Sequence, residues 1–237
     1  MSRRRILAIV RKELRDYRRN RYTMLTMSFI PLVFLAQPLI YILRLPTAAA
    51  LGLSHQHELL YLLGIPTLTP SIVAAASVVS ERQTGTLEPI LTTPVRREEF
   101  VLGKALAPLL PAVIVSYLIY GLCVVIIELF AHSGVAPALL QSSGVIAQLA
   151  FTPLLALWSI WVGLAISTRS SDTRAAQQLS VLGNLPLVAL TTLIALGTIH
   201  ATLALALGLG AGLLALDRLG WRVVTALFDR ERLVAGV

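Results

Sequence analysis

Long runs without charged residues dominate the hydrophobic pattern of the chain. Residues 22–43, 59–80 and 105–127 contain no Asp, Glu, Lys or Arg. As an α-helix each run would be about 33 Å long, which is enough to cross the hydrocarbon core of a bilayer once. These three runs therefore predict three membrane-spanning helices.

The second half of the chain holds two longer charge-free stretches. Residues 129–168 begin with turn-forming residues around His132, Gly134 and Pro137, which leaves one helix at about 139–167. Residues 175–216 are long enough for two spans, separated by a break near 197–200. The pattern predicts an all-α integral membrane protein with six transmembrane helices, so that both ends of the chain lie on the same side.

The composition agrees with a membrane protein and excludes several other classes. Of the 237 residues, 56% are hydrophobic and only 14% are charged. A soluble domain of this size would leave large apolar patches exposed. An ordinary soluble enzyme, a disordered chain and a secreted domain built on disulfides are thereby excluded, the last also because Cys123 is the single cysteine.

The basic residues predict the orientation. Of the 20 Lys and Arg residues, all but Arg44 fall in the N-terminal segment, in the loops after spans two and four, or in the C-terminal tail. The positive-inside rule then places both termini in the cytoplasm, in a multi-pass protein of the cell membrane. The net charge of +8 reflects this topology and contact with anionic lipids, not nucleic-acid binding.

The N-terminal segment predicts a helix that lies in the membrane interface. Over residues 3–21 the apolar side chains recur at helical spacing, opposite a basic face; they are Ile6, Leu7, Val10, Leu14 and Tyr17. Such an elbow helix anchors the chain to lipid and is also placed to touch a cytoplasmic partner. We expect one domain, with the elbow at 1–21, the bundle at 22–217 and a cytoplasmic tail at 218–237.

The loop between spans two and three predicts a second, shorter helix. Gly85 permits a sharp turn after the second span, Thr86 is a good N-cap, and Glu88 favours a first helical turn. Pro94 disfavours a helix at the residue before it and suits the start of the next one. Residues 86–92 would form a short helix across the cytoplasmic ends of two spans.

The same loop resembles the signature of the ABC type-2 permeases, which are membrane subunits of ATP-driven exporters. Residues 81–88 read ERQTGTLE and continue as PILTTPV, where the family has an acidic–basic pair, then Gly-Thr-Leu-Glu, then Leu and Pro. The resemblance implies a coupling helix that docks into a separate ATPase subunit. The residues implied in coupling are Glu81, Arg82, Gly85, Thr86, Leu87, Glu88, Ile90 and Leu91.

The resemblance also implies the partners and cofactors. Two such bundles work together, so we expect a homodimer or a pair of paralogues, in the lipid bilayer, with two nucleotide-binding subunits. The chain has no Walker A motif, so ATP and Mg²⁺ would bind those subunits. In this chain we expect no catalytic residue, no metal and no cofactor, and we take Gln37, Glu128, Trp158 and Trp161 as candidates for a translocation path or gate.

Other interpretations stay open at this point. A haem-exporter-like ABC permease has a similar length and number of spans. An intramembrane enzyme would need catalytic groups at one depth, and only Glu128, His132 and His200 come near this; a channel is a further alternative. Some ABC type-2 permeases carry re-entrant helices between spans five and six. Here residues 197–200 leave almost no outer loop, unless Asn184 and Pro186 mark a break that shifts the spans.

Overall fold

The computed structural model describes residues 2–44, 58–85, 96–131, 139, 140 and 142–228. The elements in these ranges are all helical: α1 (Arg3–Arg19), α2 (Arg21–Leu43), the 3₁₀ helix η2 (Glu58–Leu63), α4 (Gly64–Gln83), α6 (Arg97–Phe130), α8 (Ser142–Arg169), α9 (Thr173–Ala195) and α10 (Leu203–Leu227). Six helices in the described part are long and apolar enough to cross a membrane. The predicted all-α, six-span class is confirmed.

Two of the spans extend by more than one helical turn beyond the charge-free runs. Helix α6 begins at Arg97, because Glu98 and Glu99 lie in its first turn and the Glu99 carboxylate accepts a hydrogen bond from the Arg96 amide. Helix α10 continues to Leu227, through the first ten residues of the predicted 218–237 tail. Charged residues at the ends of both spans are therefore part of the bundle.

The predicted break between the last two spans lies where expected. Helix α9 runs without interruption past Asn184 and Pro186 to Ala195, and the described connection 196–202 contains no helix. The two residues therefore do not shift the spans, and the described connection holds no re-entrant helix.

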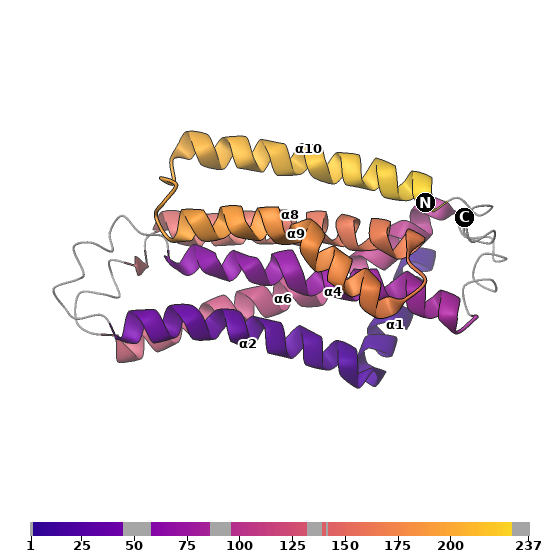
Figure 1. The fold of residues 1–237 in the computed structure, drawn as a ribbon, viewed down its shortest axis with the longest axis horizontal. Coiled ribbons are helices and arrows are strands. Elements are labelled where there is room, and N and C mark those ends of the chain that lie inside the picture. Colours follow the sequence, from indigo (N-terminus) through magenta and orange to yellow (C-terminus); the bar gives the residue numbers. More distant parts are fainter. Residues whose placement is uncertain (1, 45–57, 86–95, 132–138, 141, 229–237) are drawn as a thin grey trace.

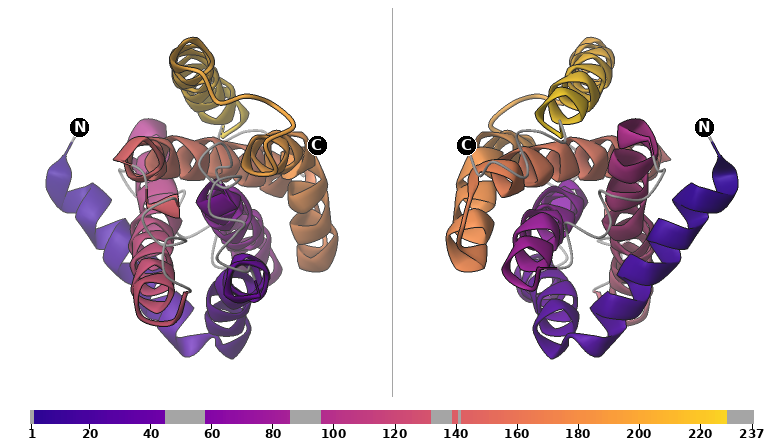
Figure 2. Two further views of the ribbon diagram at one scale, coloured as in Figure 1. Left: turned by 90° about the vertical axis from the view of Figure 1, so that its left-hand side faces the viewer. Right: turned by 90° about the vertical axis from the view of Figure 1, so that its right-hand side faces the viewer.

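Helix α4 forms the centre of the bundle. It packs against α2, α6, α8 and α9, and most of its length is buried; the end-on views show it enclosed by these helices (Figure 2). Helix α8 approaches closely because Gly163 has no side chain. A Cβ there would lie 2.5 Å from the carbonyl oxygen of Ser71.

Helix α1 crosses one end of the bundle against α6, at a steep angle to the spans (Figures 1 and 2). The chain turns at Asn20, whose extended backbone separates α1 from α2 and whose side chain accepts a hydrogen bond from the Thr23 amide. The turn lies next to the boundary expected between the elbow at 1–21 and the bundle at 22–217. The C-terminal end of α10 lies at the same end as α1 (Figure 1), as an even number of spans requires.

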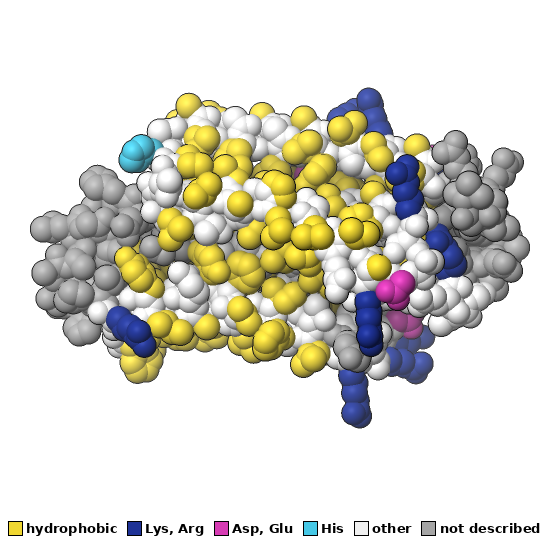
Figure 3. Space-filling view, viewed as in Figure 1, with side chains coloured by type: hydrophobic (Ala, Val, Ile, Leu, Met, Phe, Trp, Pro, Cys, Tyr) yellow, Lys and Arg dark blue, Asp and Glu magenta, His cyan; other side chains and the backbone are white. Residues whose placement is uncertain are grey.

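The surface has the pattern of a membrane protein. Hydrophobic side chains cover the middle of the face drawn in Figure 3, and most of its Lys and Arg side chains gather at the end that carries α1. An apolar belt bounded by charged ends is what a bilayer imposes on a multi-pass helical protein.

Prolines interrupt the backbone hydrogen bonding of the spans, and hydroxyl groups from neighbouring helices compensate. Pro70 cannot donate to the carbonyl of Pro66, and Ser159 Oγ donates to that oxygen at 3.2 Å. Pro153 likewise frees the carbonyl of Leu149, which accepts a 2.8 Å hydrogen bond from the Tyr117 hydroxyl. The helices continue through these prolines because adjacent spans provide the missing donors.

Candidate functional site

A buried ion cluster lies at the end of span two. Lys104 of α6 has no exposed surface, and its Nζ lies 2.7 Å from Glu81 Oε2 and 3.0 Å from Glu13 Oε1. The same ammonium donates to the carbonyl oxygen of Ser77 at 3.2 Å. A buried ammonium is costly unless it is paired and hydrogen-bonded, and these partners offset the cost of burying Lys104. One side chain thus joins α1, α4 and α6.

Lys12 completes this cluster from the surface side. Its ammonium forms an ion pair with Glu81 and lies 3.4 Å from Glu13 and 3.9 Å from Asp16. Partial burial opposes the charged form of Lys12, but the carboxylates of Glu81 and Glu13 outweigh it and raise the pKa of the ammonium. Lys12, Lys104, Glu13 and Glu81 carry balanced charge when all four are ionised.

A polar cleft opens beside the cluster, between α1, α4 and the first turn of α9. Its volume is about 390 Å³, and Glu13, Tyr17, Ser80 and Arg174 are among the residues that line it. Burial, together with the carboxylates of Glu13 and Glu81, raises the pKa of Tyr17 well above its ordinary value, so the phenol stays protonated at neutral pH. The cleft gives the ion cluster its access to water.

Arg82 joins span two to the connection between α8 and α9. Its guanidinium donates from Nη2 to the carbonyl oxygen of Thr168 at 3.0 Å and from Nη1 to that of Ser170 at 3.2 Å. Gln83 adds two hydrogen bonds, donating to the Ser171 carbonyl and accepting from the Thr173 hydroxyl, both at 3.0 Å. The last turn of α4 is thus bound to the end of α8 and the start of α9.

Glu99 performs the corresponding role on the other side of the loop 86–95. Its carboxylate accepts hydrogen bonds from the amide of Ser2 at 2.6 Å and from the amide of Arg96 at 3.3 Å, and Arg5 lies 3.5 Å away. Both ends of the loop are therefore attached to α1, one through Glu81 and the other through Glu99.

Gly85 makes the turn expected of it. Its φ of +67° lies in the left-handed region that glycine adopts at no steric cost, and its amide donates to the Arg82 carbonyl at the end of α4. The structure thus places Glu81, Arg82 and Gly85 together at the entry to the loop. The remaining predicted coupling residues lie outside the described residues: Thr86, Leu87, Glu88, Ile90 and Leu91.

The predicted path or gate residues do not come together within one chain. Gln37 of α2 and Glu128 of α6 are both exposed. Trp158 packs against the cluster that contains Leu155 and Leu213, and Trp161 is buried against α10. The two tryptophans lie three residues apart on α8, whereas Gln37 and Glu128 lie on the surface.

The sequence pattern did not reveal that three charged residues are buried, namely Glu13, Lys104 and Asp217. Glu13 lies at helical spacing from Val10 and Tyr17, so its place on the apolar face of α1 was a usable signal. Lys104 was counted only as a loop cation, although it immediately precedes a charge-free run. Asp217 was taken as the end of the last span, whereas the structure buries it within α10.

Comparison with known proteins agrees with this arrangement. A family model described as ABC-2 family transporter protein matches residues 7–224, from the first turns of α1 almost to the end of α10. No curated protein matches the chain. The match includes the first five candidate spans, most of the sixth, and the loop whose two ends carry the ion pairs. The chain therefore belongs to the ABC-2 family of transporter proteins, as a multi-pass membrane component of permease type.

Proposed function

We propose that this chain is the permease subunit of an ABC exporter in the cytoplasmic membrane, with both termini in the cytoplasm. A separate nucleotide-binding subunit hydrolyses ATP, and the permease converts the resulting movement into export of a substrate. Residues 86–91 form the segment that docks into this subunit. ATP and Mg²⁺ bind the partner, and the permease works as two copies or with a paralogue.

The observation that carries the proposal is the attachment of both ends of this loop. Glu81, with Lys104 and Lys12, links one end to α1 and α6, and Glu99 links the other end to the start of α1. Arg82 adds the end of α8. A force applied to the loop would therefore reach four helices directly, because charge-assisted contacts are stiff and directional. Attachment of the loop to several helices suits a switch of the bundle between two preformed conformations.

The exposed path candidates fit a route between two bundles. Gln37 and Glu128 face away from the core of a single chain. Exposed polar side chains within or beside spans are costly against lipid, but they are tolerated where they line a cavity filled with water. A second copy would supply the other wall of such a cavity.

The experiment is a co-purification from membranes in mild detergent, followed by an ATPase assay and a transport assay in reconstituted vesicles. Gly85→Pro cannot adopt the φ of +67° at the loop entry, and Glu88→Arg reverses a charge in the docking segment. Each should retain membrane insertion and lose coupling between ATP hydrolysis and transport. Arg44→Glu is the control. It also reverses a charge, but Arg44 directly follows the last residue of α2, at the end of this helix that is far from α1.

The outcomes separate the alternatives. Recovery of a Walker-motif subunit with the wild type, and its loss or uncoupling in both loop variants but not in Arg44→Glu, would support the proposal. Wild-type transport in both loop variants would disprove the docking role of this segment. A stable membrane complex without any ATPase, repeated in several detergents, would overturn the exporter function.

A further inference from the structure

A groove, called here the α9–α10 groove, opens between these two helices at the end of the bundle that carries α1. Its floor is the C-terminal end of α8, which packs against both helices, and its volume is about 570 Å³. The apolar walls are formed by Ile166 of α8, Leu179 of α9, and Val223 and Leu227 of α10. Leu179 and Val223 belong to spans five and six and are exposed, so the groove opens onto a surface that a bilayer would cover.

One end of the α9–α10 groove is polar and carries an unpaired cation. Arg169 is exposed and forms no ion pair with a described residue. Ser171 also lines the groove, and within the described part of the chain its hydroxyl makes no hydrogen bond. The Ser170 hydroxyl, by contrast, already donates to the Asp172 carbonyl at 3.0 Å. A free guanidinium and a free hydroxyl suit a phosphate group, which accepts several charge-assisted hydrogen bonds.

The charge of the groove selects an anion over a zwitterion. None of its lining residues is acidic. Asp172 follows in sequence, but its carboxylate caps α9 by accepting a 3.0 Å hydrogen bond from the Ala175 amide. A zwitterionic headgroup would bring an ammonium group that has no counter-charge here. The cleft beside α1 differs, because three carboxylates line it together with two cations, and it lacks this excess of positive charge.

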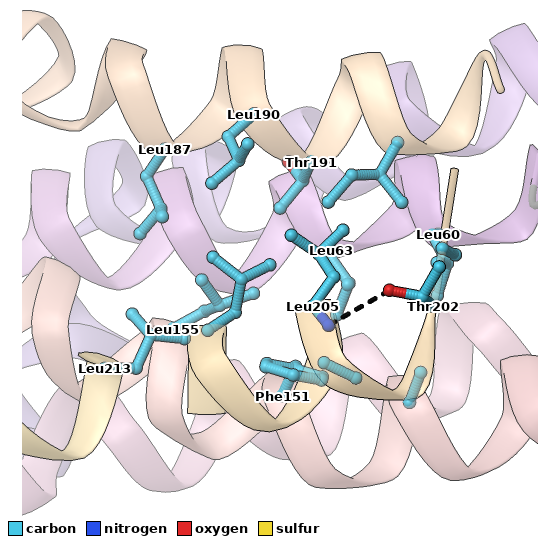
Figure 4. Close-up of a pocket in the computed structure, with 15 residues that line it drawn as sticks. Leu60, Leu63, Phe151, Leu155, Leu187, Leu190, Thr191, Thr202, Leu205 and Leu213 are labelled. Atoms are coloured by element: carbon cyan, nitrogen blue, oxygen red, sulfur yellow. Dashed lines mark hydrogen bonds between the residues drawn. The ribbon is translucent and has the colours of Figure 1, made fainter. Parts of the chain in front are cut away.

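Towards the other end of the bundle, α8, α9 and α10 enclose only an apolar cavity. It has a volume of about 90 Å³, and leucines such as Leu190 and Leu205 point into it (Figure 4). The hydroxyls at its edge are engaged within the chain, because Thr191 donates to the Val188 carbonyl and Thr202 accepts from the Leu205 amide. This cavity offers a lipid headgroup neither room nor a charge.

We propose that the α9–α10 groove binds one anionic phospholipid, with its phosphate on Arg169 and Ser171 and an acyl chain along Leu179 and Val223. Basic pockets between membrane-spanning helices are a recurrent form of lipid recognition. In the orientation proposed above, the lipid comes from the cytoplasmic leaflet. It is a bound component of the permease, distinct from the exported substrate, and its binding requires no ATPase subunit.

The lipid site adjoins the connection that α4 holds in place. Arg82 and Gln83 donate to backbone carbonyls of the α8–α9 connection, and Arg169 and Ser171 of the same connection line the groove. A lipid bound there would stabilise this connection from the membrane side and, through Arg82, the entry to the loop 86–95. The anionic lipid content of the membrane would thereby regulate the coupling loop.

The test is native mass spectrometry of the delipidated full chain in detergent, titrated with phosphatidylglycerol. We expect one saturable adduct, weaker binding of phosphatidylcholine with the same acyl chains, and about a fivefold loss of affinity in Arg169→Gln, the effect of one basic residue at an anionic headgroup. Arg174→Gln is the matched control, because it removes the same charge from the first turn of α9 but lines the cleft beside α1. Glycerol 3-phosphate, which has the phosphate without acyl chains, should not bind.

A steric variant tests the apolar part of the site. Val223→Trp would fill the groove, whereas Leu219→Trp adds the same ring to α10 at a position that does not line it. Both side chains are exposed, with 44% and 55% of their surface accessible, so neither change disturbs the core. The phosphatidylglycerol adduct should weaken in Val223→Trp and persist in Leu219→Trp.

Hydrogen exchange supplies a measurement of the regulatory consequence. Phosphatidylglycerol should slow exchange at residues 169–173 in the wild type but not in Arg169→Gln, and equal exchange with and without the lipid would disprove regulation through this connection. Equal affinity for both lipids, unchanged affinity in Arg169→Gln or Val223→Trp, or equally tight binding of glycerol 3-phosphate would overturn the lipid site. Because these assays contain no ATPase subunit, their failure and the failure of the exporter proposal are distinguishable.

Discussion

The ammonium Nζ of Lys104 lies 2.7 Å from Oε2 of Glu81, and this ion pair joins the two spans that border the loop 86–95. The lysine is wholly buried, whereas its partner cluster reaches water through the side of Lys12. The pair therefore places a costly buried charge beside the partly exposed side chain of Lys12, at the end of the bundle that carries α1. Removal of this ion pair should lower the stability of the fold and weaken the transmission of movement from the loop to the helices.

Lys104→Met should destabilise the protein strongly. It leaves Glu13 and Glu81 as two buried carboxylates with only Lys12 to balance them, and breaking a buried pair costs about 3–5 kcal/mol. Thermal unfolding in detergent should show a large fall in midpoint. The double variant Lys104→Met/Glu13→Gln should recover part of that loss, because the charge is again balanced, and the exposed Arg174→Met should change little. No recovery in the double variant would mean that lost packing, not unpaired charge, causes the defect.

Arg82→Lys should loosen the connection between α4 and α8 without unfolding the chain. A lysine keeps the charge but cannot reach the carbonyls of Thr168 and Ser170 with a planar fork of two donors. Hydrogen exchange at residues 168–173 should therefore become faster, and coupling of ATP hydrolysis to transport should weaken. Arg169→Lys is the matched control on an exposed neighbour. Unchanged exchange in Arg82→Lys would show that the two hydrogen bonds do not hold this connection.

Two glycine positions should respond to alanine with opposite signs. At Gly163 a Cβ would lie 2.5 Å from the Ser71 carbonyl, so α4 and α8 must separate and the protein should become less stable. At Gly121, within α6, a Cβ would meet nothing within 4 Å. Alanine there should stabilise the helix by about 0.4–1 kcal/mol. Comparison of the two unfolding midpoints tests whether the close approach of α4 and α8 is real.

The spans were predictable from the sequence because lipid imposes a single strong constraint. A helix that crosses a bilayer must be apolar over about 20 residues, and the charge-free runs 22–43, 59–80 and 105–127 match three of the six candidate spans, the first to within one residue at its start. The turn at Gly85 was predictable for a similar reason, since a left-handed φ favours glycine over other residues.

The ion cluster could not be predicted in the same way, because its members are far apart in the sequence. Glu13, Glu81 and Lys104 come from three helices. Packing of α4 against α6 brings Glu81 to Lys104, and the crossing of α1 over α6 brings Glu13 to it. Asp217 was missed because a charge normally ends a predicted span, whereas packing against α8 buries this one. Pairing of buried charge depends on tertiary packing that no local pattern encodes.

A hydrogen bond from Tyr117 to the Leu149 carbonyl should matter only because Pro153 is present. The proline has no amide hydrogen, so the phenol of α6 supplies the donor that the backbone of α8 lacks. Tyr117→Phe should lower stability by about 1 kcal/mol, in the range measured for hydrogen bonds in proteins. In a Pro153→Ala background the alanine amide can bond to the Leu149 carbonyl, so the same Tyr117→Phe change should cost less stability.

The measurement is a double-mutant cycle, which compares the unfolding midpoints of the wild type, both single variants and the double variant. Equal cost of Tyr117→Phe in both backgrounds would show that the tyrosine does not substitute for the missing amide.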